Sequence, residues 1–456
     1  MHESAAEPAP VRHRPAPGLT AEVCIVGAGF TGLWAAYRIL TARPDTRVVV
    51  LEQHQVGFGA SGRNAGWVSA LLSANRHKLA RQAGGHAAVV RFQKAMFTAV
   101  DEILEVLDAE GICADQRKPG HLRIARTPAA VARLAAQRES FLAWGYDPKL
   151  LELQDRDAVA GRIAAEGTLG GMFDATTAVL DPAKAVRGLA GVVEGRGASI
   201  HESTTVARIE PGRVILDDGA TVQAQHILVC TEAYSETVDG LPSRRIVPVN
   251  SSLIMTTQLS AGQWAEIGWD GNECFGDAAH VFTYGQRTTD GRIALGGRGK
   301  PYRYASGTGG SGEVGQRTVD LLQDRLHSYF PALAGIPLEH AWSGVIGVTR
   351  DWCAFVDYDP ATRIGSAGGY AGHGVTSAYV AANTMVDRML GIHTTYADLP
   401  WFGYRPPRWE PEPLRWVGIT GMYALFGAAD AWEEHRESTT TSLLARIGGR
   451  LTGVGD

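Results

Sequence analysis

Apolar runs and amphipathic stretches alternate near the beginning of the chain. Residues 21–27 (AEVCIVG) form an apolar run rich in β-branched residues, which is typical of a buried parallel strand. Residues 33–41 carry apolar side chains at helical spacing, and residues 46–51 (TRVVVL) form a second apolar run that ends at Glu52. This order predicts a strand–helix–strand unit over residues 21–52.

A glycine-rich turn joins the first predicted strand to the predicted helix. Its residues are Gly27, Ala28, Gly29, Phe30, Thr31 and Gly32. The first glycine permits a tight turn, the second lets a pyrophosphate approach the backbone, and the third lets the helix pack closely on the strand. Unpaired N–H groups at the start of the helix favour phosphate, and Glu52 with the adjacent Gln53 would accept hydrogen bonds from a ribose. The motif therefore predicts a dinucleotide site.

The pattern changes after residue 241. Residues 246–257 form a long strand-like run, and residues 281–287 and 292–297 flank a Thr-Thr-Asp-Gly turn, which indicates a β-hairpin. Long antiparallel strands that follow a strand–helix–strand unit indicate a second, sheet-based domain. The predicted fold class is α/β plus α+β, with a three-layer, Rossmann-type nucleotide-binding domain and a second, mainly antiparallel-sheet domain.

Another glycine cluster, over residues 365–376, precedes a helical pattern that ends at Gly391. Its last residues are Gly372, His373, Gly374, Val375 and Thr376. A strand that runs through glycines into a helix again presents bare backbone N–H groups and a positive helix end. The cluster therefore offers a second helix N-terminus that can stabilise negative charge.

Composition and charge exclude several classes of partner. The net charge of -5 argues against nucleic acid or an anionic membrane, and no run of 18 apolar residues predicts a transmembrane segment. The five cysteines are far apart and form no C-x-x-C pair, so we expect free thiols in a reducing cytoplasm and no metal site. Residues 1–20 lack the apolar core of a signal peptide and are expected to form a disordered arm.

A second glycine-rich loop, GFGASGRNAG over residues 57–66, follows the acidic residue. Its central residues are Gly59, Ala60, Ser61, Gly62, Arg63 and Asn64. Here the chain resembles the FAD-dependent amine and amino-acid oxidoreductases of the D-amino-acid oxidase superfamily. It is most similar to the γ-glutamylputrescine oxidoreductase branch, and the resemblance implies FAD as the cofactor.

The resemblance extends to later segments. The sequence Leu-Asp-Pro at 180–182 resembles a helix start of the family, and residues 197–202 and 205–209 resemble its next pair of strands. The resemblance implies that the backbone of Val206 touches the adenine end of FAD, that the turn at Cys230 and Thr231 lies near the pyrophosphate, and that the cluster at 372–376 faces the pyrimidine edge of the flavin. Whether His373 acts through its side chain or its backbone stays open.

One position departs from the amino-acid oxidases of the superfamily. Those enzymes hold the substrate carboxylate with an arginine, and Ile346 occupies that position here, within the stretch 342–351. Bidentate arginine–carboxylate pairing makes an α-amino acid recognisable, so its loss favours an amine. Arg287 or Arg350 would have to supply a relocated carboxylate site.

Aromatic residues are the remaining substrate candidates, because aromatic walls bind cationic or alkyl amines. The candidates for substrate contact are Tyr284, Trp342, Ile346 and Tyr370, and those for a catalytic role are Tyr284 and His373. Relatives that bind flavin covalently use a histidine at the position of Asn64 or a cysteine near Gly344. Neither is present, so we expect non-covalent FAD.

The sequence predicts FAD-dependent oxidation of an amine C–N bond to an imine, which water hydrolyses to an aldehyde and an amine or ammonia. The expected substrate is γ-glutamylputrescine or a similar amine, and oxygen or another acceptor would reoxidise the flavin. An amino-acid oxidase or dehydrogenase with relocated carboxylate binding is one alternative, and a non-catalytic flavin-binding protein is another.

The expected domains are discontinuous. The FAD-binding domain comprises residues 21–75, 152–240 and 350–395, and the substrate domain comprises 76–151 and 241–349. Residues 396–456 should form a strap and a helix that packs on the body or on a partner chain, so a homo-oligomer stays open.

Overall fold

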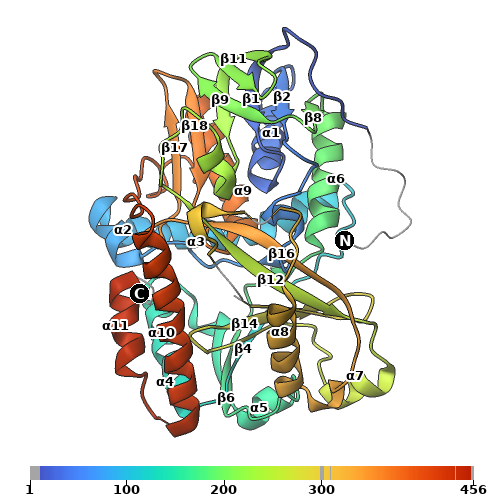
Figure 1. The fold of residues 1–456 in the computed structure, drawn as a ribbon, viewed down its shortest axis with the longest axis vertical. Coiled ribbons are helices and arrows are strands. Elements are labelled where there is room, and N and C mark those ends of the chain that lie inside the picture. The colour runs from blue at the N-terminus through green and yellow to red at the C-terminus, as the bar shows by residue number, and fades with distance from the viewer. Residues whose placement is uncertain (1–10, 298–301, 309, 437, 453–456) are drawn as a thin grey trace.

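Two large sheets organise the molecule (Figure 1). The computed structural model describes residues 11–297, 302–308, 310–436 and 438–452. One sheet lies in the upper half of the view and the other in the lower half, and the chain runs back and forth between them. The predicted fold class of a Rossmann-type domain with a second, mainly antiparallel sheet is confirmed.

The first sheet has the strand order β17-β18-β11-β1-β2-β8. Its strands are β1 (Thr20–Val26), β2 (Val48–Leu51), β8 (Ser199–His201), β9 (Val206–Glu210), β10 (Arg213–Leu216), β11 (Thr221–Val229), β17 (Phe355–Asp359) and β18 (Ile364–Gly368). The central strands are parallel, while β17 runs antiparallel to β18 and the pair β9–β10 extends from β11. The two strands expected at 197–202 and 205–209 are present as β8 and β9, but they do not pair with each other, since β8 pairs with β2 and β9 pairs with β10.

Helices cover one face of this sheet and the β9–β10 hairpin covers the other, which gives three layers. The helices are α1 (Phe30–Ala42), α3 (Gly85–Ala109), α6 (Pro182–Gly195) and α9 (Gly374–Leu390), and the short α2 (Arg76–Gln82) precedes α3. The strand–helix–strand unit predicted for residues 21–52 is present as β1, α1 and β2. Asp181 caps α6 as expected, since its carboxylate accepts the N–H groups of Ala183 and Lys184.

The second sheet has the order β16-β12-β15-β14-β13-β4-β6-β5 and is antiparallel except between β13 and β4. Its strands are β4 (His121–Ala125), β5 (Leu151–Asp155), β6 (Gly170–Asp174), β12 (Val247–Thr256), β13 (Cys274–Asp277), β14 (Thr283–Arg287), β15 (Ile293–Gly297) and β16 (Leu338–Val348). The predicted long strand is β12, and the predicted hairpin is β14–β15.

Helices α4 (Pro128–Ala143), α5 (Arg156–Ala160), α7 (Ala261–Ile267) and α8 (Gln316–Tyr329) belong to the same half of the molecule as the second sheet. Apolar side chains of α7 and α8 pack on one face of the sheet and form a separate core. The opposite face carries residues that line the cavity described below. A two-stranded ribbon of β3 (Trp67–Val68) and β7 (Ala178–Val179) completes the sheets.

The sheets divide the chain differently from the expected domain boundaries. The segment 152–174 was assigned to the nucleotide-binding domain, but strands β5 and β6 of this region pair in the second sheet. The segment 76–109 was assigned to the substrate domain, but α3 packs into the core of the first sheet against α9. Both assignments depended on where the chain changes layer, which local sequence patterns do not encode.

The arm expected at residues 1–20 has ordered contacts in its described part. Residues 1–10 lie outside the described residues. Arg12 pairs with Glu194 and Glu202, while Arg14 pairs with Asp217 and Asp218. The expectation of disorder is therefore wrong for residues 11–19, because these ion pairs attach the segment to the half of the molecule that contains the first sheet.

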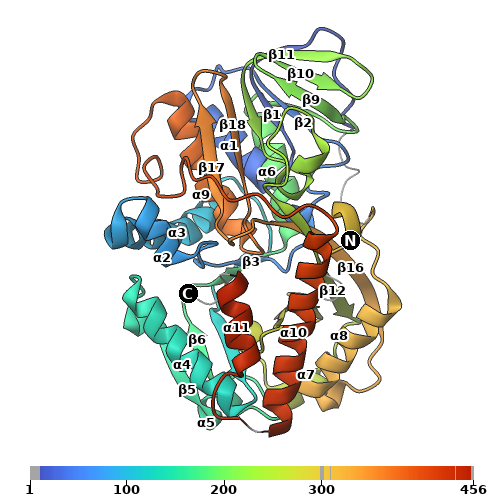
Figure 2. The ribbon, with the colours of Figure 1, turned by 60° about the vertical axis from the view of Figure 1, so that its left-hand side comes forward.

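The C-terminal segment forms two helices, α10 (Leu414–Arg436) and α11 (Leu443–Thr452). Figure 2 shows them side by side along the lower half of the molecule, next to the second sheet. The helix expected within residues 396–456 is thus present as α10 and packs on the body of the chain. None of the described helices combines the length and the hydrophobicity that a membrane-spanning segment requires.

Candidate active site

A single cavity brings the three glycine-rich segments together between the two sheets. Among the predicted residues, it is lined by Gly27, Gly29, Phe30, Thr31, Glu52, Gln53, Gly59, Ala60, Ser61, Arg63, Asn64, Val206, Cys230, Thr231, Tyr284, Ile346, Tyr370, Gly372, His373, Gly374 and Val375. Residues more than 300 positions apart in the sequence therefore share one wall. The cavity extends from the carboxyl end of β1 to the inner face of the second sheet, where β12, β14 and β16 contribute.

The first glycine motif has three different steric environments. Gly27 has a φ of +106°, and a Cβ there would lie 2.7 Å from the carbonyl oxygen of Cys230. A Cβ at Gly32 would lie 2.0 Å from the carbonyl oxygen of Gly27, so this glycine lets α1 pack on the turn. Gly29 has ordinary backbone angles and a Cβ would meet only Ser61 Oγ, at 2.8 Å. Gly27 and Gly32 thus serve the fold, while Gly29 leaves space at the cavity.

The N-terminus of α1 points into the cavity with few competing partners. The N-cap residue is Gly29, which has no side chain that could cap the helix. The first turn of α1 contains no acidic residue. The N–H of Phe30 donates to Ser61 Oγ at 2.9 Å, which ties the second glycine loop to the helix. The positive end of the helix and the Ser61 hydroxyl suit a phosphate group.

Glu52 stands at the end of β2, as the motif predicts, and lines the cavity. One carboxylate oxygen accepts the N–H of Ala28 at 2.9 Å and the other accepts the N–H of His54 at 3.0 Å. Burial raises the pKa of Glu52, and these backbone hydrogen bonds oppose that shift. A carboxylate can accept further hydrogen bonds, so Glu52 can also accept them from ribose hydroxyls, as the motif predicts.

The second glycine loop is held by its own side chains. Asn64 donates to the carbonyl oxygens of Ala60 and Ser61 at 3.0 Å, and its own oxygen accepts the N–H of Gly66. Arg63 stacks over Phe58, with 4.2 Å between the guanidinium carbon and the ring centre. Nη1 of Arg63 is buried without a hydrogen-bond partner among the described residues, and burial lowers the pKa of this side chain. It is the only lysine or arginine of the described chain that lines the cavity.

The third glycine cluster places the N-terminus of α9 at the cavity. His373 occupies the N-cap position without a side-chain cap, and no acidic residue follows in the first turn. Gly374 and Val375 line the cavity, whereas Thr376 lies behind them. The Thr376 hydroxyl is buried without a partner among the described residues. Tyr370 lines the cavity, and its hydroxyl contacts Thr31 Oγ1 of α1 at 3.1 Å.

A carboxylate that the sequence patterns missed supports this cluster. Glu232 lies just after β11 with a φ of +45° and lines the cavity. One of its oxygens accepts the N–H groups of Gly369 and Tyr370, at 3.0 and 3.2 Å. Burial raises the pKa of Glu232, and these hydrogen bonds oppose the shift. Glu232 therefore anchors the loop from which α9 starts.

Aromatic side chains from β3, from the loop before β14 and from β14 itself close the far end of the cavity. Trp67, Phe282 and Tyr284 line this end, and Tyr284 forms a hydrogen bond of 2.5 Å with Ser251. A Cβ at Gly296 would lie 2.4 Å from the ring of Tyr284, so this glycine makes room for it. The Nε1 atom of Trp67 is buried without a partner among the described residues.

Ile346 lies on the same wall, beside the third glycine cluster. A Cβ at Gly372 would be 3.7 Å from Ile346 Cδ1. Neither arginine considered as a replacement lines the cavity. Arg287 lies 3.9 Å above the ring of Trp264, and Arg350 pairs with the carboxylate of Glu410 at 2.9 Å.

Several predicted residues lie outside the cavity lining, namely Ala28, Gly32, Gly62, Trp342 and Thr376. Ala28 and Gly32 are part of the turn around the cavity. A Cβ at Gly62 would lie 2.5 Å from the carbonyl oxygen of Gly57, so this glycine shapes its loop. The indole of Trp342 donates to the carbonyl oxygen of Arg63 at 2.9 Å, which joins β16 to the loop behind the cavity wall. This placement does not support the expected substrate contact of Trp342.

The geometry fits an extended dinucleotide. The two helix N-termini, of α1 and α9, face the same cavity, and the acid of the motif lies beside the first. The absence of Cβ atoms lets a ligand reach the backbone at Gly29, and Arg63 supplies a buried positive charge. A pyrophosphate would be stabilised at α1, and an anionic ring edge would be stabilised at α9.

Comparisons with known proteins agree with this geometry. The chain is 29% identical to the γ-glutamylputrescine oxidoreductase of Escherichia coli over 411 residues, which covers 88% of this chain and 91% of that protein. It is 27% identical to a probable oxidoreductase, OrdL, of Rhizobium meliloti, covering 82% and 84%. Among solved structures, glycine oxidase from Geobacillus kaustophilus has a TM-score of 0.68 at 19% identity and covers 85% of this chain and all of that one. At such identity this likeness concerns the fold.

A match to a family profile shows which protein family the chain belongs to. The profile described as FAD dependent oxidoreductase matches residues 22–388, which include all three glycine-rich segments and most of both sheets. FAD is the cofactor of this family, and the dinucleotide geometry described above fits it. The chain therefore belongs to the family of FAD-dependent oxidoreductases.

Proposed function

We propose that the protein oxidises the C–N bond of an amine that lacks an α-carboxylate, such as γ-glutamylputrescine or a related amine. The main support for this proposal is the composition of the far end of the cavity, where Ile346 lies in a wall with Trp67, Phe282 and Tyr284. Among the described residues, Arg63 is the only arginine or lysine that lines the cavity, and its guanidinium stacks on Phe58 of the second glycine loop. An α-carboxylate would lose its hydration there without gaining a bidentate partner.

The same wall suits an amine. Aromatic faces attract an ammonium group. Desolvation inside the cavity lowers the pKa of the bound amine and so favours its neutral form. A neutral amine can lose hydride from the adjacent carbon without a general base. Tyr284 and His373, the two candidates for a catalytic role, both line the cavity.

The residues of the chain orient the reaction and exclude water. Bound FAD supplies the two-electron acceptor. Tyr284, fixed by its hydrogen bond to Ser251, and Ile346 would hold the reacting carbon against the glycine cluster that precedes α9. The substrate C–N bond becomes a C=N bond, and water then adds to give an aldehyde and an amine or ammonia. The N-terminus of α9 stabilises negative charge that develops next to it.

Amino-acid oxidation is the second candidate, because the fold is shared with a glycine oxidase. It would need a relocated carboxylate partner. Arg287 and Arg350 are both engaged elsewhere, by Trp264 and Glu410. The amine therefore remains our proposal.

An anaerobic titration separates the two substrates. The visible flavin band of the purified protein is followed while γ-glutamylputrescine, putrescine, D-alanine and glycine are added in turn. We expect bleaching by an amine and none by the amino acids. Bleaching by amino acids alone would refute the proposal, and a flavin that no compound reduces would point to a non-catalytic flavoprotein. Oxygen uptake after reduction then tests oxygen as the acceptor.

We also propose that FAD is bound non-covalently. The amide of Asn64 is engaged by its own loop, and Cys353 is buried with its thiol near Asp351 rather than along the cavity. Precipitation with acid should release all of the flavin into the supernatant. Flavin that stays with the precipitated protein would contradict this.

A further inference from the structure

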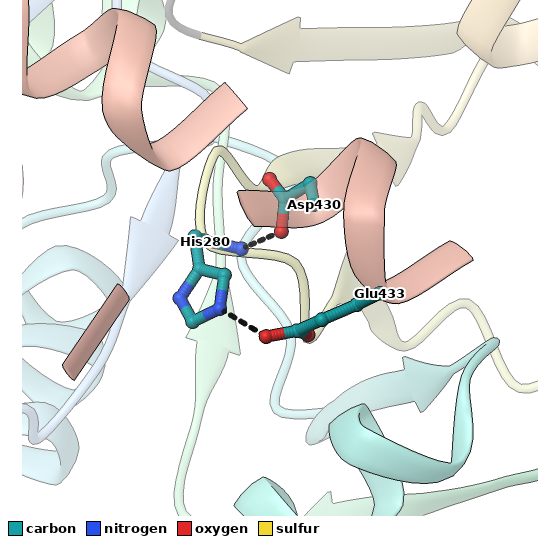
Figure 3. Close-up of side chains that lie close together, drawn as sticks. All are labelled: His280, Asp430 and Glu433. Carbon is teal, nitrogen blue, oxygen red and sulfur yellow. Dashed lines mark hydrogen bonds and ion pairs between the residues drawn. The ribbon is translucent and has the colours of Figure 1, made fainter. Parts of the chain in front are cut away.

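The C-terminal helix α10 contacts the loop that carries part of the aromatic wall. This loop, residues 278–282, joins β13 to β14 and ends at Phe282, and β14 continues with Tyr284. Figure 3 shows His280 of this loop beside Asp430 and Glu433 of α10. The loop that carries Phe282 is therefore contacted by α10, which lies beyond the family match that ends at residue 388.

Asp430 binds the backbone of the loop directly. Its two carboxylate oxygens accept the N–H groups of His280 and Val281, at 2.8 and 2.9 Å. The side chain is buried, with 8% of its surface exposed. A buried carboxylate that accepts two adjacent backbone N–H groups fixes the local path of the chain, since charge-assisted hydrogen bonds are stronger than neutral ones.

Glu433 adds a second attachment one helical turn later. It contacts Nε2 of His280 at 3.0 Å and Nη1 of Arg133 at 3.2 Å, and it accepts the N–H of Ser442 at 2.9 Å. Burial raises the pKa of Glu433, but the hydrogen bonds from His280 and Ser442 and the charge of Arg133 outweigh it and lower the pKa to about 2. Arg133 also donates to the carbonyl oxygen of Ala278, at 2.7 and 3.0 Å.

The same three side chains could be taken for a metal site, because their ligand atoms lie within 4.8 Å of one another. Their hydrogen bonds argue otherwise. Both oxygens of Asp430 accept backbone N–H groups, and the Arg133 guanidinium already supplies a positive charge to Glu433. The ring of His280 also stacks on Phe426 of α10, with 5.9 Å between the ring centres. The cluster thus joins a helix to a loop.

We propose that α10 is a positioning element for the substrate wall, in which Asp430 and Glu433 set the path of the loop and hence the position of Phe282. This inference rests on the proposed function to the extent that it treats this end of the cavity as the substrate end. It gives the C-terminal segment a role in selectivity between amines, exerted through the loop and without contact with the reacting atoms.

The test compares Asp430→Ala and Asp430→Asn with a matched control, Glu434→Gln. Glu434 is the neighbouring exposed acid of α10, and its ion-pair partner among the described residues is Arg325, at 3.7 Å. Hydrogen–deuterium exchange reports the amides of residues 278–285 in the flavin-loaded protein. Steady-state rates are measured with the amine that bleaches the wild-type flavin best and with a bulkier homologue.

We expect exchange at His280 and Val281 to accelerate at least about tenfold in Asp430→Ala. KM should rise about tenfold and the preference between the two amines should change, while kcat, flavin content and the visible flavin spectrum stay within about twofold of wild type. Asp430→Asn keeps the side-chain shape and should show a smaller effect of the same kind. Glu434→Gln should behave like wild type.

Two results would overturn the inference. One is unchanged exchange in Asp430→Ala. The other is a parallel fall in kcat, flavin content and melting temperature, which would indicate a general structural role. If no amine reduces the wild-type flavin, the proposed function fails, and the exchange measurement by itself decides whether Asp430 orders the loop.

Discussion

Alanine at Gly29 tests where the cofactor meets the chain. Gly29 has φ of −86° and ψ of −176°, which alanine adopts without strain. Its Cβ would meet only Ser61 Oγ, at 2.8 Å, and a serine side chain can move by a few tenths of an ångström. We therefore expect the unfolding free energy of the apoprotein to change by less than about 1 kcal/mol.

The same Cβ would occupy the space through which a pyrophosphate approaches the helix. Overpacking of this kind costs about 1–3 kcal/mol, so the FAD dissociation constant should rise about 5- to 150-fold. Gly32→Ala is the contrasting variant, because its Cβ would lie 2.0 Å from a backbone oxygen. That variant should lose about 3 kcal/mol or more of apoprotein stability.

The assay combines urea unfolding of the apoprotein with FAD binding followed by flavin fluorescence. The double variant Gly29→Ala/Ser61→Ala removes the 2.8 Å contact and leaves the new methyl group in place. It should keep the weakened FAD affinity. Wild-type affinity in Gly29→Ala, or its recovery in the double variant, would refute the placement of the pyrophosphate at Gly29.

Three further predictions follow from the contacts of the site. Ile346→Arg should raise the ratio of kcat/KM for an α-amino acid to that for an amine about 10- to 150-fold, since a charged hydrogen bond contributes about 1.5–3 kcal/mol; an unchanged ratio would show that Ile346 does not lie in the substrate wall. Glu232→Gln keeps the oxygen that accepts two backbone N–H groups and should cost about 1 kcal/mol in urea unfolding, whereas Glu232→Ala should cost about 3 kcal/mol, and equal losses would contradict the anchoring role. The pKa of Glu433 is lowered from 4.5 to about 2, so its stabilisation is present above the ordinary pKa and is lost as the pH falls. The stability difference between wild type and Glu433→Gln should shrink by about 2 kcal/mol between pH 5 and pH 3 in urea titrations, and a constant difference would mean that the ion pair contributes nothing.

The cofactor half of the site could be predicted because its signals are local. The strand, the glycines, the helix and the acid follow one another within residues 20–52, and each has a conformational reason visible in the sequence. Glu232 gave no such signal. It acts through backbone N–H groups of residues 369 and 370, and only the parallel pairing of β11 with β18 brings them together.

The substrate half depends on strand register, which the sequence specifies poorly. Alternation along β16 correctly groups Trp342 with Ile346 on one face, but it does not tell where along the strand the cavity ends. Trp342 lies past that end and bonds Arg63. Phe282 could have been found by the same alternation, since it precedes Tyr284 by two residues. Trp67 follows the second glycine loop, but its place opposite Tyr284 depends on the β3–β7 pair.

The interleaved course of the chain limits how such a protein can be recombined. The strands of the first sheet come from three stretches of sequence, and those of the second sheet come from the two stretches between them. In a chimera, a single crossover anywhere between β4 and β16 would therefore join strands from different parents in both sheets at once. Residues 414–436 come after the last strand and pass through neither sheet. That terminal helix can therefore be exchanged or redesigned as one continuous segment of the gene without changing a strand of either sheet.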